Sequence, residues 1–162
     1  FETMYNANGV GIAAPQIGLS VRLFIVDTNP FSDDESLSDE ERSQLKSFKK
    51  IFINPKILDQ NGDEWSFEEG CLSIPNIRES VFRQESIKIQ YFDENFTQHI
   101  ESYDGLLARV IQHEHDHIEG ILFTDKLSSF KKQLLKKKLL KISSGKLSFD
   151  YEMQFFKSSK KR

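Results

Sequence analysis

Three of the four histidines of the chain lie within five residues, in the segment His113-Glu114-His115-Asp116-His117. In a helix, His113 and His117 would lie one turn apart on one face, with their Cβ atoms about 5–6 Å apart. Two imidazoles so placed can bind one divalent metal ion, and Glu114 beside them can act as a general base on a water molecule at that metal. His115 points away from this pair and is expected either to be peripheral or to lie just behind the metal ligands. The pentapeptide therefore predicts a catalytic metal site.

A metal held by two histidines needs further ligands, and the candidates are Cys71, His99 and the carboxylates. Cys71 follows Gly70, a residue type that lets backbone approach closely. A cysteine thiolate is a strong ligand for Zn²⁺ or Fe²⁺, although a lone cysteine is also compatible with a small buried apolar residue. His99 lies among polar residues and is expected at the surface. Since the chain has one cysteine, it cannot form an intrachain disulfide.

A third segment, residues 9–18 (GVGIAAPQIG), consists mostly of small residues around one polar side chain, Gln16. Such a run allows a peptide substrate or another backbone to lie close to it. The Gln16 amide could then donate a hydrogen bond to a developing oxyanion. The glycine spacing is not GxGxxG and no Lys-Ser/Thr pair follows, so a phosphate-binding loop is not expected.

The segments GVGIAAPQ, EGCLS and QHEHDH, in that order, closely resemble the three signature motifs of peptide deformylases. The resemblance extends between the motifs over nearly the whole chain. It implies one catalytic domain over residues 1–162, in which part of the usual segment before the first motif is missing. It also implies an enzyme that removes the N-formyl group from the N-terminal methionine of newly made proteins by metal-dependent hydrolysis and releases formate.

The resemblance implies a role for each motif residue. Cys71, His113 and His117 would bind one metal ion, Fe²⁺ in the cell, which Zn²⁺, Ni²⁺ or Co²⁺ can replace; by ligand type alone the set suits Zn²⁺. Glu114 would be the general acid and base, and Gln16 with the Leu72 backbone N–H would bind the oxyanion. Substrate would be bound by residues near all three motifs, namely Val10, Gly11, Phe67, Gly70, Arg78, Leu106 and Val110. Arg109 falls on a position that is apolar in some members.

Two other functions fit parts of the sequence. A zincin-type metallopeptidase also uses HExxH, but its third ligand normally lies downstream, and Glu119 is too near His117 to reach the same metal. A non-catalytic, metal-stabilised protein that binds the ribosome would have no use for Glu114. The metallopeptidase hypothesis therefore leaves the third metal ligand unexplained, and the ribosome-binding hypothesis leaves Glu114 unexplained.

Charge divides the chain into two parts. Residues 1–125 have a net charge of −13, whereas residues 126–162, with 12 basic and 2 acidic residues, have a net charge of +10. The basic part is either a solvated helix face or a surface that meets an anionic partner such as the ribosome, where N-formylmethionyl nascent chains emerge. The lysines concerned are Lys131, Lys132, Lys136, Lys137, Lys138 and Lys141. With no apolar run of eighteen residues and no signal-like segment, we expect no membrane partner and a cytoplasmic, bacterial location.

The elements that must position these residues indicate an α+β fold, with mixed or antiparallel sheets around a central HExxH helix and a further C-terminal helix. Strands are expected at residues 21–27, 51–57, 86–92 and 96–102, with a hairpin turn at Asn61-Gly62 and Pro55 breaking or bordering its strand. Helices are expected at residues 1–8, 104–120 and 128–142, with a short one from Ser38 inside an acidic, insertion-like loop around residues 31–43. The alternation of Leu147, Phe149 and Tyr151 predicts a terminal strand or an added tail, and the 14 phenylalanines predict an aromatic core.

Overall fold

The computed structural model describes residues 1–147 and 149–155, in which the strands form one antiparallel sheet in sequence order. The strands are β1 (Gly11–Ala13), β2 (Leu23–Asp27), β3 (Lys49–Cys71), β4 (Ile74–Phe92) and β5 (Gln98–Asp104). Each strand pairs with the next along the chain. The predicted α+β class is confirmed, with one sheet rather than several among these residues.

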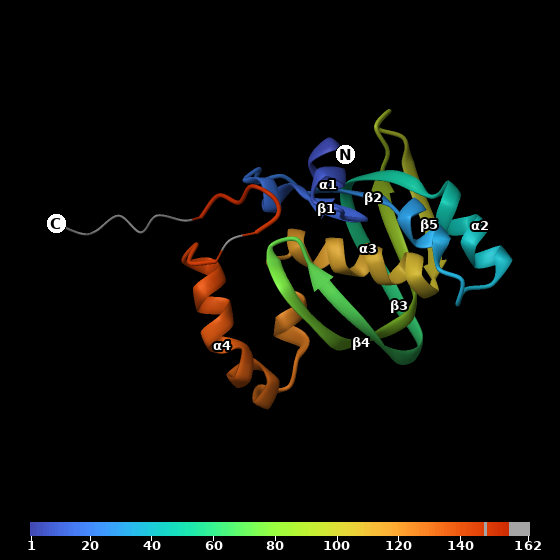
Figure 1. The fold of residues 1–162 in the computed structure, drawn as a ribbon. Helices are drawn as coiled ribbons and strands as arrows, with labels where there is room; N and C mark the ends of the chain where they lie inside the picture. The colour runs from blue at the N-terminus through green and yellow to red at the C-terminus, as the bar shows by residue number, and fades with distance from the viewer. Residues whose placement is uncertain (148, 156–162) are drawn as a thin grey trace.

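The helices of the described residues are α1 (Glu2–Asn6), α2 (Asp39–Ser47), α3 (Gly105–Ile118) and α4 (Ser129–Ser143). Figure 1 shows α3 in the middle of the molecule with the β3–β4 hairpin curving round it, and α2 and α4 at opposite ends. Asp104 ends β5 and is also the N-cap of α3, so this helix starts directly from the sheet. No helix in the described part of the chain is long and apolar enough to cross a membrane.

The hairpin turn predicted at Asn61-Gly62 is wrong. β3 continues through these residues to Cys71, and the turn consists of Leu72 and Ser73, since Cys71 pairs with Ile74. The register shifts between Asn61 and Glu64, and Gly62 has a φ of +84°, so the turn-forming pair makes a bulge inside the strand. Pro55 does not break the strand either, because a second register shift between Ile53 and Lys56 accommodates it.

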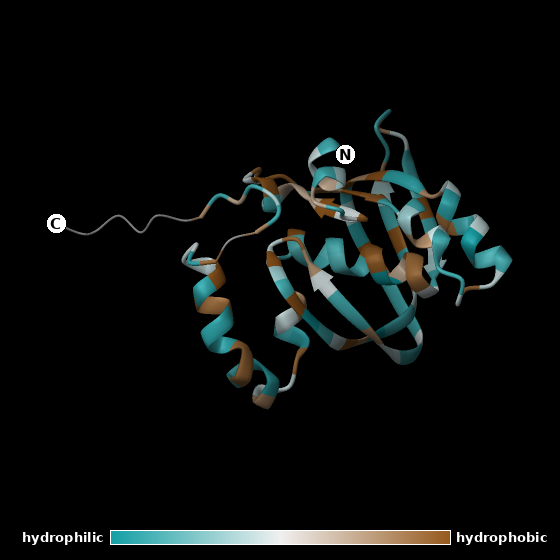
Figure 2. Ribbon diagram, in the orientation of Figure 1, coloured by the Kyte–Doolittle hydropathy of each residue, from teal (hydrophilic) through white to brown (hydrophobic). Residues whose placement is uncertain are grey.

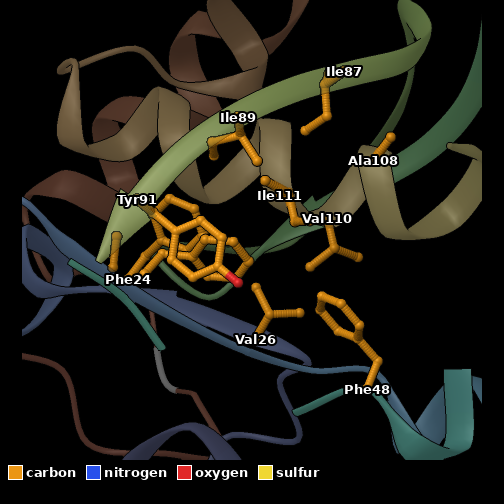
Figure 3. Close-up of a cluster of buried hydrophobic side chains, with 11 residues drawn as sticks. Phe24, Val26, Phe48, Ile87, Ile89, Tyr91, Ala108, Val110 and Ile111 are labelled. Atoms are coloured by element: carbon orange, nitrogen blue, oxygen red, sulfur yellow. The ribbon is translucent and has the colours of Figure 1, made fainter. Parts of the chain in front are cut away.

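The main core lies between the sheet and α3, as Figure 3 shows. The Phe52 ring stacks on Phe24 with ring centroids 4.7 Å apart, and it lies tilted against Tyr91 at 4.4 Å, which confirms the aromatic core. From α3, Ala108 and Ile111 are fully buried against these side chains. This packing fixes the position of the helix that carries the histidines.

A second core cluster lies under α4 and contains Ile74, Ile77, Val81, Phe123, Leu127 and Ile142. It holds α4 against the start of β4, next to the Leu72-Ser73 turn. Ser128 caps α4 by accepting a hydrogen bond from the Lys131 backbone N–H. Figure 2 shows hydrophobic and hydrophilic residues interspersed along this helix.

Other elements lie close to their predicted positions. The short helix expected from Ser38 is α2, where Ser38 and Glu41 form a reciprocal capping box. The strand expected at residues 96–102 begins and ends two residues later. Beyond α4, the sequence predicts either a terminal strand or an added tail. Residues 144–147 and 149–155 contain no strand, so the strand is wrong and these residues form a tail. Residues 156–162, which belong to the same prediction, lie outside the described residues.

Candidate active site

Cys71, His113 and His117 come together in the structure, with their ligand atoms all within 4.8 Å of one another. The Cys71 Sγ lies 3.2 Å from the His117 Nε2. α3 supplies both histidines from one face, and the β3–β4 turn brings Cys71 to them across the sheet. A thiolate with two imidazoles fits Zn²⁺, Fe²⁺ or a related transition metal, and three protein ligands leave a coordination position for water or substrate.

The charges around the triad also fit a cation. Burial opposes a charge on His113, but Cys71 and Glu69 outweigh it and raise the pKa of this histidine to about 10. Burial lowers the pKa of His117 to about 4, which keeps its imidazole in the neutral, metal-binding form at neutral pH. A divalent cation would satisfy the preference for positive charge beside His113 and replace its proton.

Glu69 orients His113 and was not anticipated from the sequence. Its Oε2 accepts a hydrogen bond from the His113 Nδ1 at 2.9 Å, which leaves Nε2 for a metal. The Arg83 guanidinium binds both oxygens of Glu69, at 2.6 and 2.9 Å. Burial alone would raise the pKa of Glu69, but the hydrogen bonds from Arg83 and His113 hold it well below its usual range. The carboxylate therefore stays ionised at neutral pH.

Two further charged residues complete this buried network. Arg83 also binds Asp116 of α3 at 2.6 Å. Arg109 binds Glu69 at 3.0 Å and donates to the Trp65 and Val81 carbonyls, so its guanidinium is used within the protein. The sequence held one signal for Glu69, which lies two residues before Cys71 and so on the same side of a strand. Nothing in the sequence around Arg83 distinguishes it from a surface arginine.

Glu114 is buried beside the triad, with 4% of its surface exposed. Among the described residues, its Oε2 has no hydrogen-bond partner. Burial raises the pKa of Glu114 to about 7, the range in which a carboxyl group can both accept and donate a proton near neutral pH. Gly11 of β1 covers this carboxylate, and a Cβ there would lie 2.6 Å from the Glu114 Oε1. The site therefore combines three side chains that could hold a metal ion with a confined carboxyl group.

Gln16 lies beside Cys71, in the short 3₁₀ helix Ala14–Ile17. Its Oε1 accepts a hydrogen bond from the Ala13 backbone N–H at 2.7 Å, which directs the amide nitrogen toward the β3–β4 turn. There the nitrogen lies 3.1 Å from the Ser73 Oγ and 3.7 Å from the Cys71 Sγ. Hydrogen bonds at the oxygen and at the nitrogen of the amide group therefore fix its position next to the triad.

A cavity of about 420 Å³ opens beside these residues. Its wall includes Leu72 and most of the residues predicted to bind substrate, namely Val10, Gly11, Phe67, Gly70, Arg78 and Val110. Leu106 is half-buried and is not among the lining residues. Phe31, Ile77 and Tyr151 also line the cavity and were not predicted. Arg78 lies at its exposed edge, where it pairs with Glu68.

The two remaining histidines stand apart from the triad. His99 of β5 pairs with Asp93, which precedes that strand, at 2.8 Å. His115 lies on α3 with its Nε2 3.7 Å from the Glu119 Oε1. Neither belongs to the group of ligand atoms around Cys71.

Comparison with known proteins gives consistent matches. The sequence model of the family described as polypeptide deformylase matches residues 1–133. The chain is 59% identical over its whole length to a peptide deformylase of Christiangramia forsetii, covering 83% of that protein. It is 62% identical to that of Flavobacterium psychrophilum, over 95% of this chain and 79% of the relative.

Solved structures agree. A peptide deformylase from Legionella pneumophila is 37% identical, with a TM-score of 0.71 over 90% of this chain and 77% of that one. Peptide deformylase 1B of Arabidopsis thaliana, solved in complex with an inhibitor, is 32% identical, with a TM-score of 0.75 over 90% of this chain and 74% of that one.

Proposed function

The chain belongs to the peptide deformylase family, and from this membership we propose how its residues divide the work of deformylation. The protein is a hydrolase that removes the formyl group from the N-terminal methionine of newly made proteins and releases formate. The metallopeptidase and the non-catalytic alternative are not favoured, because relatives over the whole chain carry the deformylase name.

The metal is held by Cys71, His113 and His117 in this proposal. The observation that carries it is the convergence of their ligand atoms within 4.8 Å, next to the buried Glu114. When bound, the metal supplies Lewis-acid activation of a water molecule near neutral pH. We propose Fe²⁺, one ion per chain, with Zn²⁺, Ni²⁺ or Co²⁺ as replacements. Iron bound to a thiolate is prone to oxidation, so the iron form should lose activity in air faster than the nickel form.

Glu114 moves the proton. Its carboxylate accepts a proton from the attacking water, whose oxygen bonds to the formyl carbon. The same carboxyl group then donates this proton to the departing amine nitrogen as the carbon–nitrogen bond breaks. The products are formate and a peptide with a free amino terminus. The burial that raises the pKa of Glu114 to about 7 suits both directions of transfer.

Gln16 and Leu72 stabilise the oxyanion that develops on the formyl oxygen. The Gln16 amide nitrogen is directed to the triad because the Ala13 N–H holds its Oε1. The Leu72 backbone N–H follows the ligand Cys71 directly in the chain. Donors fixed before the reaction stabilise the charge without a cost of reorganisation during it.

The cavity binds the substrate. Val10, Phe67, Leu72 and Val110 would form an apolar wall for the methionine side chain. The backbones of Gly11 and Gly70 would pair with the extended peptide as an added strand. Arg78, at the exposed edge, would contact the peptide beyond the methionine.

We further propose that α4 binds the ribosome surface in the cytoplasm, where the nascent substrates emerge. Two of its lysines make contacts within the protein, since Lys131 pairs with Glu79 and Lys138 donates to the Asn76 carbonyl. Lys132, Lys136, Lys137 and Lys141 lie at exposed positions along the helix. Binding to anionic RNA would weaken steeply with salt. Co-sedimentation with ribosomes that is absent at low salt, or insensitive to salt, would contradict this proposal.

The proposed catalytic role is tested by formate release from formyl-Met-Ala-Ser, with protein loaded with Fe²⁺ or Ni²⁺ without oxygen. We expect release by the native chain and almost none by Glu114→Gln, which keeps the size of the side chain but not its ability to accept the proton. Glu119→Gln is the matched control, since this exposed residue follows α3 and pairs with Arg22. Equal rates for the native chain and Glu114→Gln would refute the assignment.

A further inference from the structure

The chain beyond α4 returns to the tip of the β3–β4 hairpin (Figure 1). Leu147 and Phe149 pack against the second core cluster, which also contacts Cys71. The Phe149 and Phe155 rings lie 6.4 Å apart, and a Cβ at Gly145 would lie 2.9 Å from the Phe155 ring. Gly145 and Phe155 therefore lie side by side, so the tail leaves the end of α4 and comes back to it.

Tyr151, between these anchors, reaches the active site. Its hydroxyl donates a hydrogen bond to the Leu72 carbonyl at 2.6 Å. Among the described residues beyond α3, Tyr151 is the one that lines the substrate cavity. The alternation of Leu147, Phe149 and Tyr151 in the sequence thus places two apolar residues on the core and a phenol at the cavity.

The Leu72-Ser73 turn needs to be held in place, because it projects from the end of a long hairpin. On one side, Gly9 contacts the Leu72 side chain so closely that a Cβ would lie 2.7 Å from its Cδ1. On another side, Gln16 donates to the Ser73 hydroxyl. The Tyr151 hydroxyl is the group that bonds the Leu72 backbone itself, and so restrains the peptide rather than a side chain.

We propose that Tyr151 is a positioning residue for deformylation, whose hydroxyl holds the Leu72-Ser73 turn so that the Leu72 N–H stays directed at the reacting formyl oxygen. The inference rests on the oxyanion role proposed for that N–H. A donor that binds the transition state more strongly than the ground state affects kcat rather than KM. The tail is therefore part of the catalytic apparatus and not only a cover for the second core cluster.

Tyr151→Phe tests this, since it removes the hydroxyl and keeps the ring. In the full chain loaded with Ni²⁺, we expect kcat for formate release to fall about tenfold, less than the ~10²–10³ lost when an oxyanion donor is removed outright. KM, metal content and the thermal midpoint should stay as in the native chain. Tyr5→Phe is the matched control, because the Tyr5 hydroxyl bonds Asp27 outside the cavity. It should leave kcat unchanged.

A second variant tests the route by which the tail acts. Phe149→Ala loosens the anchor of Tyr151 without removing the hydroxyl, and should lower kcat in the same direction. The double variant should lose no more than Tyr151→Phe alone, because both changes act through one hydrogen bond. Additive losses, an unchanged kcat in Tyr151→Phe, or a rise in KM alone would overturn the proposal. The proposed function is judged separately. If the native chain releases formate and Glu114→Gln does not, the proposed function stands even when the role of Tyr151 is overturned.

Discussion

At the scale of single residues, Gly11 shows how tightly Glu114, the proposed general base, is confined. A Cβ at this position would lie 2.6–2.8 Å from three atoms of the Glu114 side chain, so Gly11→Ala must displace the carboxyl group. Misplacing a catalytic group by an ångström costs about 10²-fold in rate, and we expect kcat/KM for formate release to fall by that order. Ile12→Val, at the next position of the same strand, should have little effect. Full activity in Gly11→Ala would mean that Glu114 is not needed where it lies.

Glu69 acts at the same scale but through another residue. Glu69→Gln removes the negative charge between Arg83, Arg109 and His113. The buried Arg109 then has no carboxylate partner among the described residues, and Arg83 keeps only Asp116. We expect a loss of about 3–5 kcal/mol in the free energy of unfolding. Because Glu69 orients His113, a proposed metal ligand, the loss of its carboxylate should also weaken metal affinity by about 10–100-fold.

Urea unfolding and competition with a chelator measure the two effects of Glu69→Gln. Glu68→Gln is the matched control, because its side chain is 64% exposed and its pair with Arg78 should contribute about 0–1 kcal/mol. Equal stability and equal metal affinity in the two variants would show that Glu69 has no special role.

At the scale of elements, α4 is attached through its apolar side. Ile142 is 4% exposed in the second core cluster, whereas Leu140, two residues earlier, is 59% exposed. Ile142→Ala should lower the free energy of unfolding by about 2–5 kcal/mol through the cavity it leaves. Leu140→Ala should change it by about 0.5 kcal/mol or less. Similar losses in urea unfolding for both variants would contradict this arrangement of α4.

The elements also show what periodicity can predict. The helix from Asp104 to Gly120 was predictable because its apolar residues repeat at helical spacing and Gly120, at φ +74°, ends it. The β3–β4 turn was not, because Leu-Ser is not one of the glycine-containing pairs that signal a two-residue hairpin turn. Asn61-Gly62 has a turn signal, but strand pairing on both sides makes it a bulge.

The candidate site also contains residues that the sequence predicts and residues that it does not. The metal triad, Glu114 and Gln16 lie in short motifs whose residue types indicate their chemistry. Arg83 and Tyr151 act only through partners far along the chain, Arg83 with Glu69 14 residues away and Tyr151 with Leu72 79 residues away. Such long-range pairs depend on the register of the hairpin and the path of the tail, which a local pattern does not contain.

At the scale of the whole molecule, the proposed metal joins parts of the chain that are far apart in sequence. Cys71 ends β3 and His117 lies 46 residues later on α3, so one ion would connect the hairpin to the helix. Anything that binds the folded state more tightly than the unfolded state stabilises it, by about 2.7 kcal/mol when its concentration is 100 times its Kd.

Removing the metal should therefore destabilise the whole fold and not only stop catalysis. We expect a chelator to lower the thermal midpoint of the metal-loaded chain by about 5–10 °C, since 1 kcal/mol corresponds to about 2–4 °C in a domain of this size. Calorimetry without oxygen, before and after chelation, measures the shift. Cys71→Ser, which lacks the thiolate ligand, should respond much less to the same chelator. Identical midpoints for the native chain with and without metal would mean that the triad does not link the hairpin to α3 through an ion.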